Sequence, residues 1–453
     1  MNLKDKNVLV VGLSKTGEAL CKFLLNKGAS VTVSELKNNN QLSIHKAFWK
    51  QRGVTMESGE HKIKTFLNAD LIIPSPGVPM IPELRAAKEK GIKIISEIEL
   101  AYQFLKGKIV GITGSNGKST TATLTHKILK EGGLKAYLAG NIGTPLISFV
   151  DQSRDDHVYV IEISSFQLQH IERFKVFVSI LLNITPDHLD WHSSFDEYYE
   201  AKKKLVVSQY EEDIAILNLD DPLVRKLKNQ GDYSVYGFSR KIKPKKGCYI
   251  DNDNIILSSE KNEIIMKTSE IPLKGIHNQE NVMASILAGH LFHIQKEHIK
   301  NSIKSFQGLE HRLEKVTSIN GIEFYNDSKA TNVDAALKSI DSFNKNIILI
   351  LGGRDKEGDF KKLKRSVEKR VKKILLIGEA TEKIKKALKK TVPMDRVSCL
   401  KEAVNSGYFS AKNGDIVLLA PACTSFDMFE NFEQRGRIFK KEIFEFKKIL
   451  NNE

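Results

Sequence analysis

The sequence of 453 residues lacks the long apolar segments that mark membrane-spanning and secreted proteins. No run reaches the roughly 18 consecutive apolar residues that a membrane-spanning helix needs. The N-terminus enters a strand-like pattern at Asn7–Val11 without the apolar segment of a signal peptide. We therefore expect no membrane insertion and a cytoplasmic location.

Cysteine is scarce, and the four cysteines (Cys21, Cys248, Cys399 and Cys423) lie far apart with no paired spacing. This pattern excludes a disulfide framework and a zinc site built from cysteine pairs. We expect all four to be reduced thiols.

Acidic residues are outnumbered, since 55 Asp and Glu against 70 Lys and Arg give a formal net charge of +15. Such an excess can indicate nucleic-acid binding. The lysines are spread along the chain, however, as in residues 361–365 and 383–386, at spacings typical of solvated helix faces. We predict no nucleic-acid partner and assign part of the excess to the binding of anionic small substrates.

Strand-like and helix-like segments alternate along the chain, which predicts parallel βαβ units. The length suffices for about three domains, and no repeat of roughly 20–50 residues is present. The predicted fold class is α/β, with three α/β domains in series: a Rossmann-like N-terminal domain (1–104), a P-loop ATPase-like central domain (105–308) and a Rossmann-like C-terminal domain (309–453). The turn-rich segment 233–270 predicts a small antiparallel elaboration of the central domain.

The most informative segment is Gly107–Thr120, where an apolar strand leads through a glycine-rich turn into a helix. Glycines let backbone N–H groups point at an anion, the helix N-terminus adds positive potential, Lys118 adds a full charge and Ser119 offers a hydroxyl to magnesium. The spacing departs from the commonest P-loop, because Ile112 stands where that motif has a glycine. We predict ATP binding by the loop residues Gly114, Ser115, Asn116, Gly117, Lys118, Ser119 and Thr120.

Polar residues also follow later strands. Glu162 ends an apolar strand, at the sheet edge where phosphate-bound magnesium needs an oxygen ligand. The loop 183–190 contains two aspartates and His188, and a helix with three consecutive lysines, 202–204, comes soon after. The P-loop upstream favours Glu162 as a metal ligand, whereas spacing alone supports no role for His188 or the lysines.

In the first domain, Gly12–Gly17 follows a strand as a dinucleotide-binding fingerprint does, although Ser14 replaces its middle glycine. Glu35 stands at the separation where NAD enzymes place the acid that binds the ribose. An NAD-dependent dehydrogenase is therefore a rival interpretation of this domain, beside a plain tight turn.

Further motifs are spread over all three predicted domains. They are Gly114–Thr120, Gly140–Gly143, Glu162–Leu168, Asp187–Asp190, Gly275–Asn281, Glu310–Arg312, Asn326–Asn332 and Gly352–Lys356. Together they resemble the Mur ligases of peptidoglycan synthesis. The run Pro421–Gly436 is similar to the family member that adds D-glutamate, and the Asp-Asn-Pro-Arg signature of the diaminopimelate- or lysine-adding member is absent from the sequence.

This resemblance implies an ATP-dependent amide ligase that adds D-glutamate to UDP-N-acetylmuramoyl-L-alanine through an acyl-phosphate intermediate. It implies ATP and two Mg²⁺ ions as cofactors. It also implies D-glutamate and UDP-N-acetylmuramoyl-L-alanine as the small-molecule partners. We expect a monomer. A folylpolyglutamate-type or cyanophycin-type ligase and a non-catalytic nucleotide-binding scaffold are the rival interpretations.

The resemblance also assigns residues. Lys118 and Ser119 would contact the phosphates and magnesium, with Glu162 on the first metal ion and His188 on the second. The remaining nucleotide contacts would be Asn278, Asn281, His311, Arg312, Asp327 and Lys329. The muramoyl substrate would meet Asn141 and Ser164, and its uridine diphosphate would meet Ser14, Lys15, Thr16 and Ser75. D-Glutamate would meet Thr331, Lys356, Ser425, Phe426 and Phe432.

The family also uses a carbamylated lysine to help bind the second magnesium ion. The Ala201-Lys202 context assigns it to Lys202, although Lys203 and Lys204 are adjacent. The family's uracil-binding pair has no clear counterpart in Ser34–Leu36.

Overall fold

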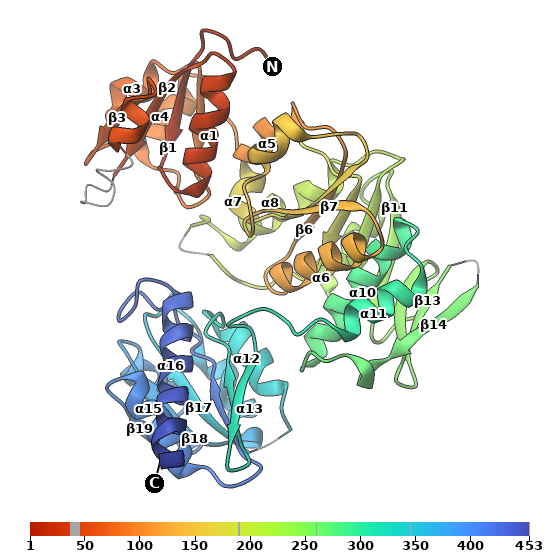
Figure 1. Cartoon of the computed structure of the whole chain (residues 1–453), viewed down its shortest axis with the longest axis vertical. Helices are drawn as coiled ribbons and strands as arrows, with labels where there is room; N and C mark the ends of the chain where they lie inside the picture. Colours follow the sequence, from red (N-terminus) through yellow and green to blue (C-terminus); the bar gives the residue numbers. More distant parts are fainter. Residues whose placement is uncertain (37–45, 189–190, 260, 345, 453) are drawn as a thin grey trace. The chain divides into compact units, whose positions relative to one another are not determined.

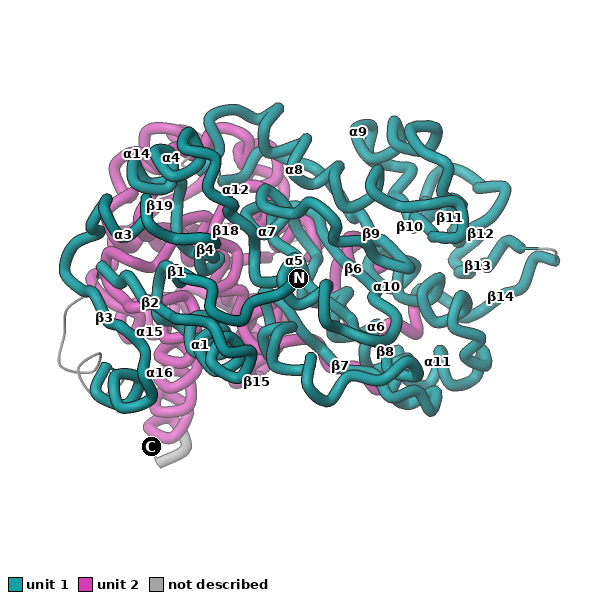
Figure 2. Tube along the Cα trace, turned by 90° about the horizontal axis from the view of Figure 1, so that it is seen from above, with its two compact units in different colours: residues 1–268, 280–303 teal, residues 269–279, 304–453 magenta. Residues whose placement is uncertain are grey.

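The computed structural model describes residues 1–36, 46–188, 191–259, 261–344 and 346–452. Its three β-sheets alternate with helices, so the predicted α/β class is confirmed (Figure 1). The chain forms two compact units, one of residues 1–268 and 280–303 and the other of residues 269–279 and 304–453 (Figure 2). The first unit holds two sheets and the second holds one. The domain boundaries at 104 and 308 stay predictions.

The N-terminal sheet has five parallel strands in the order β3-β2-β1-β4-β5. Its elements are β1 (Asn7–Val11), α1 (Lys15–Asn26), β2 (Ser30–Glu35), β3 (Thr55–Ser58), α3 (Ile63–Leu67), β4 (Leu71–Pro74), α4 (Pro82–Glu89) and β5 (Lys93–Ile94). Because β1 is central, the loops after β1 and β4 meet at the carboxyl edge, where open α/β sheets bind ligands.

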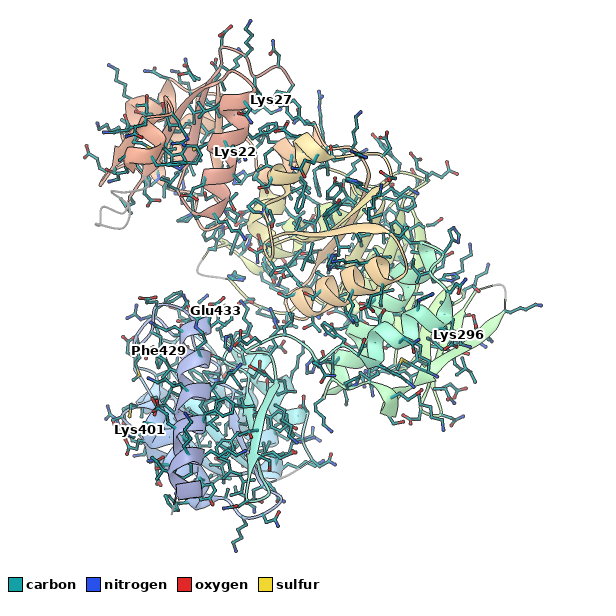
Figure 3. All side chains as sticks on the ribbon, in the orientation of Figure 1. Lys22, Lys27, Lys296, Lys401, Phe429 and Glu433 are labelled. Carbon is teal, nitrogen blue, oxygen red and sulfur yellow. The ribbon has the colours of Figure 1, made fainter. Side chains whose placement is uncertain are left out.

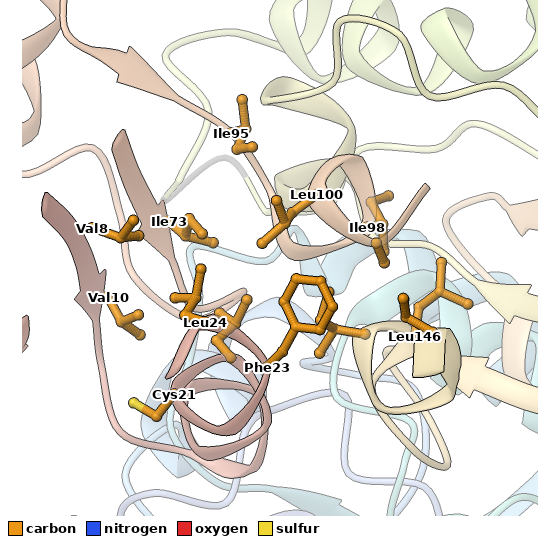
Figure 4. Close-up of a cluster of buried hydrophobic side chains, with 14 of the residues drawn as sticks. Val8, Val10, Cys21, Phe23, Leu24, Ile73, Ile95, Ile98, Leu100 and Leu146 are labelled. Carbon is orange, nitrogen blue, oxygen red and sulfur yellow. The ribbon is translucent and has the colours of Figure 1, made fainter. Parts of the chain in front are cut away.

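Helix α1 forms because its apolar residues recur at helical spacing and cover one face of this sheet. Leu20 and Leu24 lie in one buried cluster with Val8 and Val10 (Figure 4). These two valines are two residues apart on β1 and so lie on the same face of the sheet. The same cluster continues through Phe23 to side chains that follow the N-terminal sheet in sequence, among them Ile98 and Leu146. The first unit is thus held together by a continuous apolar core.

Two buried carboxylates fix helix α5 (Glu97–Tyr102), which follows the N-terminal sheet in the chain. Glu99 Oε2 accepts the three backbone N–H groups of residues 172–174 at 2.9, 3.0 and 2.8 Å. Glu97 Oε1 accepts the N–H of Ile147 at 2.6 Å. Backbone donors of the central region therefore anchor α5.

The central sheet has nine strands in the order β14-β13-β12-β11-β10-β9-β6-β8-β7. Its strands are β6 (Lys108–Thr113), β7 (Lys135–Gly140), β8 (His157–Glu162), β9 (Val178–Leu181), β10 (Ile214–Asn218), β11 (Ser234–Ser239), β12 (Gly247–Asp251), β13 (Asn254–Ser258) and β14 (Asn262–Lys267). The antiparallel elaboration predicted for 233–270 is present in β12, β13 and β14. The prediction is wrong for β11, which pairs parallel with β10 and β12 and extends the main sheet.

Helices and 3₁₀ segments connect these strands. They are α6 (Lys118–Glu131), η1 (Leu146–Gln152), α7 (Ser165–Gln169), α8 (Phe195–Val207), α9 (Pro222–Arg225), η2 (Lys226–Asn229), η3 (Thr268–Glu270), α10 (Ile276–Leu291) and α11 (Lys296–Lys304). Strand β6 lies between β8 and β9, so the glycine-rich loop after it is flanked by the loops that follow both neighbours.

The second unit contains a six-stranded sheet in the order β15-β16-β20-β17-β18-β19, antiparallel in the β15–β16 pair and parallel elsewhere. Its strands are β15 (Glu314–Ile319), β16 (Ile322–Asn326), β17 (Ile347–Gly352), β18 (Val371–Ile377), β19 (Met394–Arg396) and β20 (Ile416–Leu419). Its helical elements are α12 (Val333–Asp341), η4 (Phe360–Leu363), α13 (Lys364–Arg370), α14 (Thr381–Ala387), α15 (Leu400–Ser410) and α16 (Phe432–Asn452).

The excess positive charge is distributed over many elements. Figure 3 labels Lys22 on α1, Lys296 on α11 and Lys401 on α15, and Lys296 pairs with Glu263 at 3.1 Å. Among the described residues, no helix is both long and apolar enough to cross a membrane. The absence of a nucleic-acid partner stays a prediction.

The anchoring of α5 predicts a pH-dependent stability. Burial raises the pKa of the Glu97 carboxyl to about 7, above its ordinary value of 4.5, so the folded state holds a proton that the unfolded state releases. Stability from this group is present below pH 4.5 and is lost as the pH rises to 7, by about 2 kcal/mol between pH 5 and 7.5. Between pH 5 and 7.5, the free energy of unfolding of Glu97→Gln, measured by urea unfolding, should rise by this amount relative to that of wild type. If the variant and wild type differ in this free energy equally at both pH values, the prediction is contradicted.

Candidate active site

The glycine-rich loop joins β6 to α6 in the largest sheet, where β6 lies between β8 and β9. Gly114 and Gly117 have φ values of 151° and 90°, which L side chains rarely adopt. A Cβ at Gly117 would also lie 2.4 Å from Asn281 Oδ1, which comes from α10. The loop can therefore turn its backbone toward an anion at the helix N-terminus, as the sequence predicts.

The loop is held by the segment that follows β9. Asn183 accepts the N–H of Asn116 at 2.8 Å and donates to its carbonyl at 3.0 Å. Ser115 Oγ donates to the Thr185 carbonyl at 2.8 Å and lies 2.8 Å from the Tyr198 hydroxyl. The Ser115 hydroxyl thus fixes the loop, and Asn183 is a contact of the loop that was not predicted. Its position directly after a strand beside β6 was the available signal.

The side chain of Lys118 folds back onto the glycine-rich loop. Its Nζ donates to the carbonyls of Gly114 and Ser115, both at 2.9 Å. The ammonium group therefore lies beside the backbone that a phosphate would approach, where it can offset anionic charge.

Ser119 and Glu162 meet because β8 lies beside β6, with Ile112 opposite Glu162. The Ser119 hydroxyl donates to Glu162 Oε2, and Asn141 Nδ2 donates to Oε1 at 3.0 Å. Ser119 and Glu162 are buried. Hydroxyl and carboxylate oxygens are the ligands that Mg²⁺ prefers, so this pair fits the predicted metal position.

Lys202 differs from its two neighbours by complete burial, with 1% of its surface exposed. Its Nζ donates to the Gly114 carbonyl at 2.9 Å and lies 3.4 Å from Thr113 Oγ1. Burial, reinforced by the charge of Lys118, holds the Lys202 pKa well below its usual value, against the opposing effect of Asp187 and Glu162.

The neighbouring lysines bind elsewhere. Lys203 pairs with Glu200 at 3.1 Å, and Lys204 donates to the Gln169 carbonyl at 3.2 Å. Of these three lysines, Lys202 is the one whose Nζ donates to the phosphate loop, at the Gly114 carbonyl, which favours the predicted choice.

His188 lies in the loop that also supplies Asn183. Its backbone is left-handed, with φ 55°, and its N–H donates to Asp187 Oδ1 at 3.0 Å. The ring Nε2 lies 3.7 Å from Asp187 Oδ2, and the ring packs edge-on against Phe166. Leu189 and Asp190, which belong to the same predicted motif, lie outside the described residues.

Glu35 fixes the first loop of the N-terminal sheet. Its Oε2 accepts the N–H of Leu13 at 2.8 Å, while Ser75 Oγ donates to the Gly12 carbonyl at 3.0 Å. A ribose would have to compete with this backbone N–H for Glu35. The dehydrogenase interpretation therefore loses its main support.

Three predicted substrate residues follow in this region. Ser14 and Lys15 are exposed at the start of α1, and Thr16 is half-buried. Lys15 Nζ donates to the Gly143 carbonyl, in the loop that contains Asn141. Ser164 caps α7 by accepting the N–H of Gln167 at 3.3 Å.

Within α10, the two predicted asparagines have different surroundings. Asn278 Nδ2 donates to the Lys274 carbonyl at 2.6 Å. Asn281 is buried beside Gly117, as described above. Asn281 is thus brought to the P-loop within the first unit.

The second unit gathers the nucleotide residues predicted for the C-terminal domain. Asp327 is half-buried and accepts a hydrogen bond from the Ser339 hydroxyl, and desolvation raises the pKa of its carboxyl despite the charge of Arg312. Lys329 donates its N–H to the His311 carbonyl at 3.1 Å. Its Nζ lies 3.8 Å from the centre of the Phe432 ring, a cation–π arrangement.

The residues predicted for D-glutamate lie partly at the surface of this unit. Lys356 is exposed, and 59% of the Phe426 surface is accessible. Ser425 is buried, and its carbonyl accepts the N–H of Phe429 at 2.8 Å. Thr331 donates its N–H to the Lys329 carbonyl at 2.8 Å, so the nucleotide and amino-acid sets share one loop.

Three protein-family models match the chain. They are the Mur ligase MurD-like N-terminal domain over residues 6–96, the Mur ligase middle domain over 112–289, and the Mur ligase glutamate ligase domain over 311–423.

Curated relatives match over nearly the full length. The chain is 47% identical to a protein of Acidobacterium capsulatum, over 97% of the chain and 96% of the relative. It is 45% identical to one of Koribacter versatilis, over 97% and 98%. Both relatives are named UDP-N-acetylmuramoylalanine–D-glutamate ligase.

Solved structures share the fold. The chain resembles the UDP-N-acetylmuramate-alanine ligase MurC of Thermotoga maritima with a TM-score of 0.61 and 16% identity, over 97% of the chain and 99% of that protein. It resembles the MurF ligase of Thermotoga maritima in complex with ADP with a TM-score of 0.60 and 15% identity, over 98% and 96%.

The two hydrogen bonds that join Asn183 to the backbone of Asn116 form a clamp on the loop, and removing this Asn183 clamp should weaken nucleotide binding. Asn183→Ala deletes two hydrogen bonds to the loop backbone, and a loss of about 1.4 kcal/mol corresponds to a tenfold weaker binding of ATP. Titration calorimetry with Mg²⁺-ATP measures the change. Asn229→Ala, at an exposed position, is the matched control. Equal affinities of the two variants would show that the clamp does not shape the site.

Proposed function

The chain belongs to the Mur ligase family, and from that premise we propose that it adds D-glutamate to UDP-N-acetylmuramoyl-L-alanine with conversion of ATP to ADP and phosphate. The product is a precursor of peptidoglycan. The observation that carries the proposal is that half-buried Lys118 and buried Ser119, Glu162 and Lys202 gather around one phosphate loop, in a chain whose near-full-length relatives have that enzyme name.

The chemistry follows from the substrates. A carboxylate is a poor acyl donor, so its oxygen first attacks the γ-phosphorus of ATP, ADP leaves, and an acyl phosphate forms. The amine of D-glutamate then attacks the carbonyl carbon, phosphate leaves, and the amine loses a proton. Negative charge accumulates in the first step, and Lys118 with the backbone N–H groups at the start of α6 is assigned to offset it.

Magnesium is assigned to the oxygen donors of the central site. Glu162 and Ser119 are proposed for the first ion, and His188 with modified Lys202 for the second. When bound, Mg²⁺ ions neutralise phosphate oxygens and orient the reacting groups. Glu162 accepts hydrogen bonds from the Ser119 hydroxyl and the Asn141 amide, and both side chains can turn aside for a cation.

Carbamylation is proposed at Lys202. A lysine whose pKa is held low is neutral for part of the time, so its nitrogen can attack CO₂, forming an N–C bond and releasing a proton. The resulting carbamate is an anion and can bind or orient a hydrated cation. The charges of Asp187 and Glu162 act in the opposite direction to burial and raise the pKa of Lys202, so these two carboxylates attract positive charge.

The second unit is proposed to supply the remaining contacts. Arg312, Asp327 and Lys329 are assigned to the nucleotide. The D-glutamate carboxylates are assigned to Thr331, Lys356, Ser425 and Phe426, with Phe432 packing nearby. Asn278, which belongs to the second unit, and Asn281, which belongs to the first, both lie on α10 within the family motif Gly275–Asn281 and are also assigned to the nucleotide. Ser14, Lys15, Thr16, Ser75, Asn141 and Ser164 are assigned to the UDP-muramoyl substrate. A monomer in the cytoplasm, where ATP and UDP-linked precursors are available, completes the proposal.

The activity predicts that phosphate release needs both substrates together. Mixtures of the protein with Mg²⁺-ATP should release phosphate in the presence of UDP-N-acetylmuramoyl-L-alanine and D-glutamate, and not when either is omitted. Replacing the muramoyl substrate by a folate tests the folylpolyglutamate-type alternative. Turnover with folate, or turnover unaffected by omission of D-glutamate, would contradict the proposal.

The modified lysine predicts a selective loss of activity. Lys202→Ala removes an anionic group beside the reacting phosphates and should lower kcat by about 100-fold, in line with the loss of one preorganised charge. Added short carboxylic acids should restore part of it by entering the vacated space. Lys204→Ala is the matched control, because Lys204 lies on the same helix and donates to the Gln169 carbonyl. This variant should retain activity within about twofold. Full activity of Lys202→Ala without added acid would rule out the role.

A further inference from the structure

Arg435 is the largest fully buried side chain of the protein's described residues, with 2% of its surface exposed. It lies in the first turn of α16, two residues after Glu433, which Figure 3 labels. Its guanidinium group makes four hydrogen bonds. Nε donates to Ser328 Oγ at 2.9 Å, Nη2 to the carbonyls of Ser328 at 2.8 Å and Cys423 at 3.2 Å, and Nη1 to that of Thr424 at 3.2 Å.

These partners belong to two loops that carry different parts of the proposed site. Ser328 stands between Asp327 and Lys329, which are assigned to the nucleotide. Cys423 and Thr424 directly precede Ser425, which is assigned to the amino acid. One planar group thus ties both loops to the same helix turn.

The bonds of Arg435 go to neutral oxygens. Among the described residues, no carboxylate forms an ion pair with it, and Asp427 acts on it only through longer-range charge. Burial lowers the pKa of Arg435 to about 10, so the group is still a cation at neutral pH. Burying a charge without a counter-ion is unfavourable, which makes a purely space-filling role a poor explanation for an arginine here.

Space for the guanidinium is provided by a glycine. Gly353 has a φ of 131°, and a Cβ there would lie 3.2 Å from Arg435 Nη1 and 2.2 Å from the Thr424 carbonyl oxygen. A lysine offers one point of attachment and cannot satisfy two loops with a rigid fork. The geometry therefore needs the shape of arginine as well as its charge.

The same helix turn makes further contacts with the nucleotide loop. Ser328 Oγ donates to the Phe432 carbonyl at 2.8 Å, and Asn326 Nδ2 lies 3.4 Å from that of Gly436. A Cβ at Gly436 would lie 2.2 Å from His311 Nδ1, so the helix packs directly on the residue whose carbonyl accepts the Lys329 N–H. Arg435 is the member of this turn that also reaches the second loop.

We propose that Arg435 is a positioning residue that holds the loop 327–331 and the loop 423–426 in one arrangement, so that the nucleotide and the D-glutamate carboxylates are received by a common rigid frame. The inference rests on the proposed function for its ligands. The arrangement of the two loops can be measured without them.

Arg435→Lys, which keeps the charge and removes the fork, tests the inference. Arg437→Lys, an exposed arginine on the same helix, is the matched control. In steady-state assays we expect Arg435→Lys to raise KM for both D-glutamate and ATP by about tenfold, because both loops lose their anchor. Hydrogen-exchange mass spectrometry without ligands should show faster exchange in peptides spanning 326–332 and 422–428. The control should match wild type in both measurements.

The outcomes separate the two claims. A wild-type protein without D-glutamate-dependent turnover would defeat the proposed function, while the exchange experiment would still decide the role of Arg435. Exchange of Arg435→Lys equal to that of wild type in both peptides would overturn the inference. The inference would also be overturned if Arg435→Lys lowered Tm but left both KM values within twofold of wild type. That pattern is expected of an arginine with a structural role only.

Discussion

The register of β8 against β6 is the constraint on which the central site depends. Ile112 lies opposite Glu162, so the end of β8 brings a carboxylate to the start of α6. Because side chains alternate along a strand, a slip of one residue would move Glu162 to the other face of the sheet. The register is fixed by burial on both faces, since every residue of β8 is buried and five of the six in β6 are. Apolar packing thereby positions a polar pair.

A lysine buried beside a phosphate loop imposes a second condition. Lys202 and Lys118 both donate to the Gly114 carbonyl, at 2.9 Å each, so two amines share one acceptor. Their mutual repulsion and the loss of hydration disfavour the charged form of Lys202. The arrangement therefore favours a neutral amine at Lys202 and is compatible with the proposed binding of anions at the loop.

Much of the fold and the centre of the site could be predicted from the sequence, because strand ends and glycine-rich turns are local signals. Glu162, the P-loop and the strands of the second unit are of this kind. Asn183 and Arg435 could not be predicted, since their roles depend on partners distant in the chain, such as Asn116 and Ser328. The parallel pairing of β11 was missed for the same reason: turn-rich sequence on its two sides resembles a hairpin, and only the neighbouring strand β10 decides its direction.

The carboxylates of the first unit differ in the donors that they accept, and this difference separates structural from functional acids. Glu35 and Glu99 accept backbone N–H groups, which are fixed by the chain and cannot leave. Glu162 accepts a hydroxyl from Ser119 and an amide from Asn141, and both side chains can rotate. A cation entering between Ser119 and Glu162 could exchange these two side-chain donors for metal–oxygen contacts, which supports the proposed metal role of Glu162. Glu35, which resembled a ribose ligand, instead holds the N–H of Leu13 and belongs to the scaffold.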